Sequence, residues 1–365
     1  MNSHEEQVRT LMAEAARLHG SPVKYALLDE AARVADAHRD IPLGFEVRSA
    51  LIWVGAGLGY NDGIAVAFAW CLHHSDTRPE LFAGRDILNE YGLVINGVTN
   101  FDAVSRPQLQ SMIADYAARR ERAGHSPAQE WAVWLLAAAD LGDRPLAARA
   151  ADELRRQRQE RLLTRGQWFR HAVFLGDTAE AMRLAEAEIL SRGFAARFDH
   201  EWYELPLLLL TVGRAADARH WLRRGVAQMS RGAAVTGYYW GFGPLAAALA
   251  LTGQVADAVT LCGVCSRAVH ADTDPLTRLH FHLDMGVVFE RLHAVGTESV
   301  PTRLGDDAPG RLPNGRYRVA EVRDWMANEA AGLADRFDRR NGNDHFAERI
   351  RERAGWQGLA RPELA

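Results

Sequence analysis

A glycine recurs through the middle of this chain at almost regular intervals, and an alanine follows each copy five residues later. The intervals are 34, 37 and 40 residues, and the pairs are Gly142 and Ala147, Gly176 and Ala181, Gly213 and Ala218, and Gly253 and Ala258. Glycine can end a helix in the left-handed conformation, and an alanine one turn into the next helix lets two helices pack closely. The spacing therefore predicts a helical hairpin that repeats along the chain.

Each glycine lies between two apolar runs of helical period, and the pattern resembles the tetratricopeptide repeat, a unit of about 34 residues. That family also has a large residue eleven positions before the glycine, where this chain has Trp131, Arg165, Trp202 and Phe242. Arg165 departs from the family pattern, and so do three bulky residues at positions where the family has a small one, Leu135, Phe169 and Pro206. The resemblance covers about residues 126 to 271 and implies degenerate, tetratricopeptide-like repeats.

The C-terminal string from Phe337 to Asp344 carries a second resemblance, to uncharacterised repeat proteins of high-GC bacteria. Lys24 is the only lysine among 43 basic residues, which also indicates a GC-rich genome. This resemblance implies a bacterial source and no particular activity.

Seventeen helices are predicted from apolar periodicity, from prolines in first turns and from glycines at helix ends. They lie near residues 5–19, 22–38, 43–58, 62–74, 84–97, 106–123, 127–141, 144–156, 165–175, 178–191, 200–212, 215–229, 237–252, 255–270, 275–294, 318–338 and 344–354. Asp344 is expected to cap the last helix. The stretch from Thr297 to Arg316, which is rich in glycine and proline, predicts either a mobile loop or a short hairpin.

These elements predict an all-α fold, an α-solenoid of tetratricopeptide-like helix-turn-helix repeats with a C-terminal capping helix. We expect diverged helical hairpins in residues 1–125, clearer repeats in 126–296, and an irregular loop with capping helices in 297–365, all in one continuous superhelix. Alternatively, the first segment is a separate helical module, although no linker rich in glycine, serine or proline divides it from the rest.

Charge and composition argue against several classes of partner. The formal net charge is −4 and the pI is about 6.4, so no net field attracts nucleic acid or an anionic membrane. The first six residues lack the basic start and apolar core of a secretory signal, and the aliphatic stretch Leu207 to Leu210 is far shorter than the ~20 residues of a membrane span. We expect a cytoplasmic protein that binds neither nucleic acid nor membranes.

Catalytic and metal-binding motifs are weak or missing. Cys262 and Cys265 have the spacing of a thiol pair, but they fall at packing positions of a repeat, so buried structural cysteines are expected. His280 and His282 are two residues apart and point in different directions on a helix, which does not suit zinc. Phosphate-binding and nucleophile-elbow motifs are absent. We therefore expect no metal, no cofactor and no enzymatic activity.

The inner face of the solenoid is the predicted binding surface. In tetratricopeptide-like folds the first helix of each hairpin lines this face, with residues about thirteen, ten and six positions before the turn glycine directed toward it. The polar and aromatic candidates at or beside these positions are Gln129, Trp168, Arg170, His200, Tyr203, Tyr239 and Trp240. Rigid aromatic residues would supply contact area and an arginine would hold a carboxylate. Packing in the core is the alternative role for the aromatic residues.

Two classes of function follow from this surface. The first is a non-catalytic scaffold whose concave face binds a protein or peptide. The alternative is a ligand- or peptide-sensing regulator that acts through a partner protein, because the chain has no helix-turn-helix DNA reader at its N-terminus. An unrecognised enzyme ranks third. A closed pocket with clustered ionisable groups would favour the sensor or the enzyme, whereas an open groove would favour the scaffold.

Overall fold

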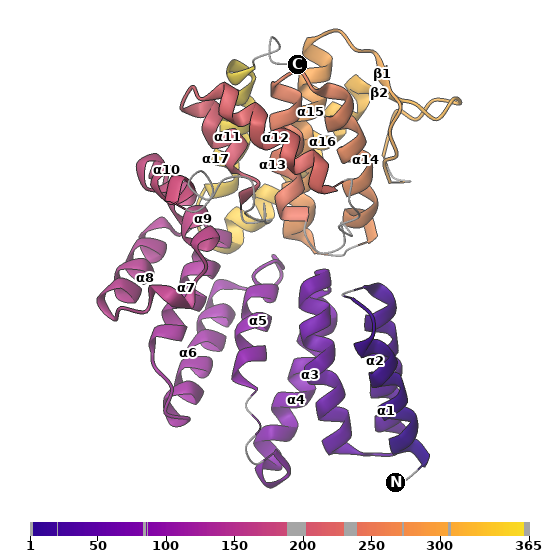
Figure 1. The fold of residues 1–365 in the computed structure, drawn as a ribbon, viewed down its shortest axis with the longest axis vertical. Coiled ribbons are helices and arrows are strands. Elements are labelled where there is room, and N and C mark those ends of the chain that lie inside the picture. Colours follow the sequence, from indigo (N-terminus) through magenta and orange to yellow (C-terminus); the bar gives the residue numbers. More distant parts are fainter. Residues whose placement is uncertain are drawn as a thin grey trace. The chain divides into compact units, whose positions relative to one another are not determined.

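The computed structural model describes residues 3–19, 21–82, 85, 87–187, 202–229, 239–271, 274–305 and 308–360, with the backbone alone at 228–229, 239–241, 267–268 and 270–271. Within these ranges the chain is all-α apart from one two-stranded hairpin. It forms two compact units, residues 1–133 (unit 1) and 134–365 (unit 2). Figure 1 colours the chain by residue number, so each unit can be followed in it. The C-terminal segment belongs to unit 2.

Unit 1 is built from helices that pack on their neighbours in sequence. They are α1 (Ser3–Ala16), α2 (Pro22–Ala37), α3 (Ile41–Leu58), α4 (Asn61–Thr77), the 3-10 turn η1 (Pro79–Phe82), α5 (Leu88–Val98), α6 (Arg106–Arg122) and the first part of α7 (Ala128–Asp140). Each helix from α1 to α6 contacts the next one, and α3 also contacts α5. This neighbour-to-neighbour packing is typical of helical repeat proteins.

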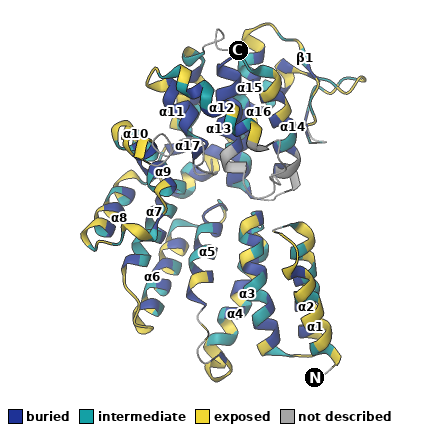
Figure 2. Cartoon of the chain, in the orientation of Figure 1, coloured by how far each residue is buried: buried dark blue, intermediate teal, exposed yellow. Residues whose placement is uncertain are grey.

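Unit 2 continues with more helical pairs. They are α8 (Arg144–Arg156), η2 (Glu160–Leu162), α9 (Arg165–Leu175), α10 (Thr178–Ala185), α11 (Leu205–Thr211), α12 (Ala215–Met229), α13 (Tyr239–Leu251), α14 (Val255–Ala271), α15 (Pro275–Ala294), α16 (Val319–Asn341), α17 (His345–Gly355) and η6 (Trp356–Leu359). The α-helices α1 to α17 of the described residues correspond one to one to the predicted helices, and the predicted ends at 188–191, 200–201 and 237–238 lie outside those residues. Figure 2 shows that α13 and α15 are buried over most of their length, so they form the centre of this unit.

The turn glycines have the predicted conformation. Gly142, Gly176, Gly213 and Gly253 all have positive φ, between 63° and 81°. At each turn the amide of the residue after the glycine donates to the carbonyl five residues before it, as Asp143 N does to Ala138 O at 2.9 Å. The four paired alanines, Ala147, Ala181, Ala218 and Ala258, are fully buried. The glycine–alanine spacing therefore marks the same helix stop and the same close packing four times.

The irregular stretch contains the short hairpin that was one of the two predicted alternatives. Strand β1 (Ser299–Val300) pairs antiparallel with β2 (Tyr317–Arg318). The chain after β1 packs on α14, where Thr302 Oγ1 donates to Val259 O at 3.2 Å and Gly305 N donates to Ser266 Oγ at 3.1 Å. The hairpin thus covers part of the outer face of α14.

The cysteines of α14 are packing residues, as predicted. Cys262 and Cys265 are fully buried in the main core of unit 2. Burial raises the pKa of Cys262 to about 12 and that of Cys265 well above its ordinary value. Both thiols are therefore protonated at neutral pH and unreactive in the folded protein.

One described helix, α3, has the length and apolar composition that would allow it to cross a membrane. The sequence analysis did not single it out. Leu43, Phe45 and Ile52 of α3 are buried, and the helix contacts α2, α4 and α5. These contacts account for its apolar composition as a core helix of unit 1.

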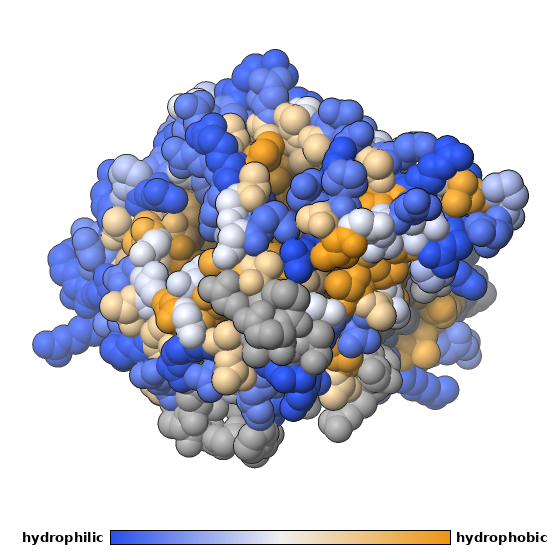
Figure 3. All heavy atoms as spheres, turned by 90° about the horizontal axis from the view of Figure 1, so that it is seen from above, coloured by the Kyte–Doolittle hydropathy of each residue, from blue (hydrophilic) through white to orange (hydrophobic). Residues whose placement is uncertain are grey.

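On the face drawn in Figure 3, hydrophilic residues predominate and apolar residues lie in separate patches among them.

Candidate ligand-binding cavity

The last helix, α17, folds back onto the beginning of unit 2. Asn341 Nδ2 donates to Asp140 O at 3.2 Å and Asn343 Nδ2 donates to Leu141 O at 2.8 Å, so two amide side chains bind carbonyls at the end of α7. Gly342 between them has a φ of 71°, which makes the sharp turn between α16 and α17. The string from Phe337 to Asp344 thus binds the end of α7, which lies about two hundred residues earlier in the chain.

Asp338 provides the cap of α17. Its two carboxylate oxygens accept hydrogen bonds from Phe346 N and Ala347 N, both at 2.9 Å. Asp344, which the sequence analysis expected in this role, makes no side-chain capping bond. Asp344 therefore stands at the predicted N-cap position, but the carboxylate that reaches the first free amides of α17 comes from the preceding helix, across the turn.

His345 fixes the start of α17 against the turn between α7 and α8. A Cβ placed on Gly142 would lie 2.2 Å from the Cβ of His345, so the His345 side chain packs directly on the glycine backbone. The His345 ring also contacts the Phe174 ring of α9 edge-on, with centroids 5.6 Å apart. Gly142 is therefore needed twice, for the left-handed turn and for the close approach of α17.

A cavity of about 440 Å³ lies between α17 and the first helices of successive hairpins. Its walls come from α7, α9, α11, α13 and α15 on one side and from α17 and η6 on the other. Leu136, Arg170 and Leu207, each six positions before its turn glycine, line it, whereas the described residues ten and thirteen positions before these glycines do not. In α13 the lining residue is Pro244. The inner face of unit 2 thus carries α17, with a partly open cavity between them.

The cavity combines apolar walls with ionisable groups. The apolar part includes Leu135, Leu207, Leu208, Phe174, Phe346 and Trp356. The ionisable part includes Asp140, Arg144, Arg170, His171, Glu204, His280, Asp284, His345, Arg349, Glu352 and Arg353. Cavities of a few hundred Å³ with apolar walls and a few converging polar groups are typical small-molecule sites.

Asp284 and Arg353 form a buried ion pair at one wall. Arg353 Nε donates to Asp284 Oδ1 at 3.1 Å, and both side chains are at most 7% exposed. The guanidinium also stacks on the Trp356 ring, with 3.8 Å from its carbon to the ring centroid. Burial raises the pKa of Asp284, and the charge of Arg353 counteracts part of this rise. The pair neutralises its own charge and holds α17 and η6 to α15.

The three histidines of the cavity are uncharged at neutral pH. Burial lowers the pKa of His345 to about 3, with Arg349 and Arg144 contributing, and lowers that of His171 to about 4. Burial and the nearby arginines also lower the pKa of His280 well below its ordinary value. Positive charge in the cavity therefore comes from arginine alone.

Of the predicted site residues, the structure places only Arg170 in this cavity. Tyr203 is buried in the core of unit 2, where its ring packs on Phe242 at 5.3 Å. Trp168 lies in a smaller depression of about 240 Å³ beside α8, with Arg155 over its ring. Gln129 lies in unit 1 and accepts a hydrogen bond from the Tyr116 hydroxyl at 3.4 Å. His200 and the side chains of Tyr239 and Trp240 lie outside the described residues.

Most of the charged lining residues were not among the predicted site residues. His280 and Asp284 are four residues apart on α15, and Arg349 and Arg353 are four apart on α17, so each pair shares one helix face. This spacing was visible in the sequence. What was not visible is that α17 lies on the inner face, which is what brings these two pairs together.

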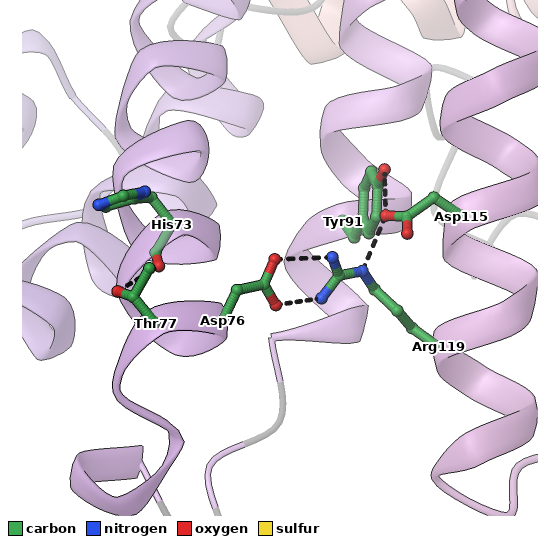
Figure 4. A network of polar contacts seen from close by, with 6 residues as sticks. All are labelled: His73, Asp76, Thr77, Tyr91, Asp115 and Arg119. Carbon is green, nitrogen blue, oxygen red and sulfur yellow. Dashed lines mark hydrogen bonds and ion pairs between the residues drawn. The ribbon is translucent and has the colours of Figure 1, made fainter.

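Unit 1 contains a separate polar network, drawn in Figure 4. Arg119 of α6 binds both carboxylate oxygens of Asp76 of α4, at 2.6 and 2.8 Å, and its Nε donates to Asp115 at 2.8 Å. The Tyr91 hydroxyl of α5 donates to the same Asp115 oxygen at 3.0 Å. The hydrogen bond from Arg119 lowers the pKa of Asp76. Because these groups bind one another across α4, α5 and α6, the network holds the three helices together.

Comparison with known protein families gives no match, and comparison with curated proteins gives no relative. Among the residues that the structure describes, no three histidine, cysteine or acidic side chains are grouped so that they would hold a metal ion.

Proposed function

We propose that unit 2 is a ligand-sensing module that binds a small molecule in this cavity without chemical conversion. The observation that carries the proposal is the cavity itself, which has about 440 Å³ of space, apolar walls and several charged groups on the inner face of the helical array. These are the properties of a pre-formed small-molecule site. The proposal corresponds to the second of the two function classes that the sequence suggested.

An open scaffold for a long peptide fits unit 2 less well. The first helices of the hairpins face α17, and the Asn341 and Asn343 amides, His345 and Arg353 attach this helix at both ends. A long peptide would have to displace these contacts before it reached the inner face. A small molecule needs only the space that α17 leaves free.

The position of α17 also supports a sensing role. The helix contributes one wall of the cavity, and helices α7 to α15 contribute the other. A ligand that touches both walls stabilises the docked position of α17, because it binds that arrangement more tightly than any other. Tetratricopeptide-like hairpins commonly present surfaces to proteins, so the proposed output is a change in the affinity for a partner protein.

A ligand screen with a matched pair of variants tests this proposal. Thr211 lines the cavity and its neighbour Val212 does not, while both side chains are exposed. We expect at least one compound from a panel of amino acids, organic acids, sugars and nucleotides to raise the melting temperature of the full chain. At a concentration of 100 times Kd the stabilisation would be about 2.7 kcal/mol. Thr211→Trp should abolish this shift and Val212→Trp should preserve it.

Two results would contradict the proposal. One is a complete absence of stabilising compounds. The other is a compound whose effect is equally strong in Thr211→Trp and Val212→Trp, because it would then bind elsewhere.

A further inference from the structure

Four charged side chains of the cavity make no ion pair among the described residues. Arg144 is exposed to solvent, and the other three, which are partly buried, are Arg170 on α9, Glu204 directly before α11, and Arg349 on α17. Many other arginines of unit 2 are paired, for example Arg183 with Glu180 and Arg353 with Asp284. The cavity therefore holds charges of both signs that remain available to a ligand.

Arg349 carries a buried hydrogen-bond donor. Its Nε is shielded from solvent and has no hydrogen-bond partner among the described residues. Burial and the neighbouring Arg353 lower the pKa of Arg349, whereas the charge of Glu204 opposes this change. A buried donor without a partner destabilises the structure that contains it. An anionic group from a ligand would satisfy this donor and offset the burial of its charge.

Glu204 lies within electrostatic range of Arg349 without forming an ion pair with it. Its charge raises the pKa of both Arg349 and Asp284, yet no oxygen of Glu204 lies within 4.0 Å of an arginine nitrogen among the described side chains. The two opposite charges thus face the same cavity with a gap between them. A molecule with a negative and a positive end would fill this gap and bind both groups.

The remaining walls define the third part of the ligand. Leu135, Leu207 and Leu208 come from one side of the cavity, and Phe346 comes from α17. The nearby histidines are neutral, so they do not compete with the arginines for an anion. This side of the cavity favours an apolar group of the size of a leucine or phenylalanine side chain.

We propose that the ligand of the cavity is a free α-amino acid with a large apolar side chain, whose carboxylate is bound by Arg349 and Arg170 and whose ammonium group is bound by Glu204. This inference rests on the proposed function, since it names the ligand class of the same cavity. Asp140, Arg144 and Glu352 complete the charged lining, and the last two are exposed.

Titration calorimetry of the full chain with L-phenylalanine and L-leucine tests the inference. N-acetyl-L-phenylalanine lacks the ammonium group and L-phenylalaninamide lacks the carboxylate. We expect each blocked compound to bind the wild type at least ten-fold more weakly than L-phenylalanine. The comparison uses the unaltered protein, so it does not depend on whether a variant folds.

Two variants assign the ends of the ligand. Glu204→Gln should bind L-phenylalanine and N-acetyl-L-phenylalanine with similar affinity, and Arg349→Gln should bind L-phenylalanine and its amide with similar affinity. Arg351→Gln, on an exposed position of the same helix, should keep the wild-type preference.

The possible failures are distinguishable. If neither amino acid binds, or if the blocked compounds bind as well as L-phenylalanine, the inference is wrong. If another compound of the panel binds, and Thr211→Trp abolishes its effect, the proposed function stands although the amino-acid inference fails. If no compound of any kind binds, both fail together.

Discussion

At the scale of single residues, Asp284 and Arg353 form a buried ion pair between α15 and α17. Its net contribution is smaller than its geometry suggests, because both charges lose their hydration when they are buried. The raised pKa of Asp284 reflects this loss. The pair is therefore expected to behave as a unit, in which either charge alone is unfavourable.

Arg353→Met should destabilise the protein by about 3–5 kcal/mol, because Asp284 would remain buried without its partner. The double variant Asp284→Leu with Arg353→Met should recover most of this loss, since no buried charge remains. Arg351→Met, at an exposed position two residues away, should change stability by less than about 0.5 kcal/mol. Urea unfolding followed by circular dichroism measures all three. A double variant as unstable as Arg353→Met would show that the two residues do not act as a pair.

At the scale of elements, the turn glycines explain why the helices were predictable from the sequence. Each turn is coded locally, by a glycine at positive φ and an alanine five residues later, so no distant contact is needed to recognise it. The position of α17 depends instead on bonds such as that from Asn341 to Asp140, which joins residues 201 positions apart. A contact between residues so far apart leaves no periodic pattern in the sequence. The helices could therefore be predicted, but the cavity that α17 completes could not.

Gly142 and Gly213 provide a comparison between a turn that touches α17 and one that does not. Both have positive φ, so alanine at either position should cost about 1–2 kcal/mol. At Gly142 the new methyl group would also collide with His345, whereas nothing lies within 4 Å at Gly213. Gly142→Ala should therefore accelerate hydrogen exchange of the α17 amides, and Gly213→Ala should leave α17 protected. Equal protection of α17 in the two variants would mean that the contact between His345 and Gly142 does not hold the helix in place.

At the scale of the whole molecule, the chain divides at residues 133 and 134, and residues 297–365 fold with the second unit. The sequence predicted a boundary between residues 125 and 126, with a separate first module as an alternative, whereas the observed division lies within α7, which continues across it without interruption. The repeat register placed Leu136, Arg170 and Leu207 on the cavity side of their helices, but not the other described positions that it singled out. The aromatic candidates illustrate the limit of this register. Tyr203 has a groove position in the repeat pattern, yet its ring is used in the core.

The neutral histidines of the cavity predict how the stability of the protein depends on pH. His345 has a folded-state pKa of about 3 and an ordinary value of 6.5. Below pH 6.5 the unfolded chain binds a proton at this residue and the folded chain does not, so stability falls as the pH falls from 6.5 toward 3. One such histidine contributes up to about 1.4 kcal/mol per pH unit in this window. His171 and His280 have lowered pKa values as well and act in the same direction.

His345→Gln should therefore reduce the loss of stability between pH 7 and pH 5.5 by about 1 kcal/mol. This range lies above the titration of most carboxylates, so the histidine contribution dominates the change. The variant is expected to be less stable than the wild type at pH 7, because it alters the contact with Gly142, and the slope with pH is the quantity that tests the prediction. His19→Gln serves as the control, since His19 is exposed in unit 1 and its replacement should leave the slope unchanged. Urea unfolding at each pH gives the slopes. If His345→Gln and wild type lose stability in parallel, then His345 is not held neutral by burial, and the arginines would not be the only cations of the cavity.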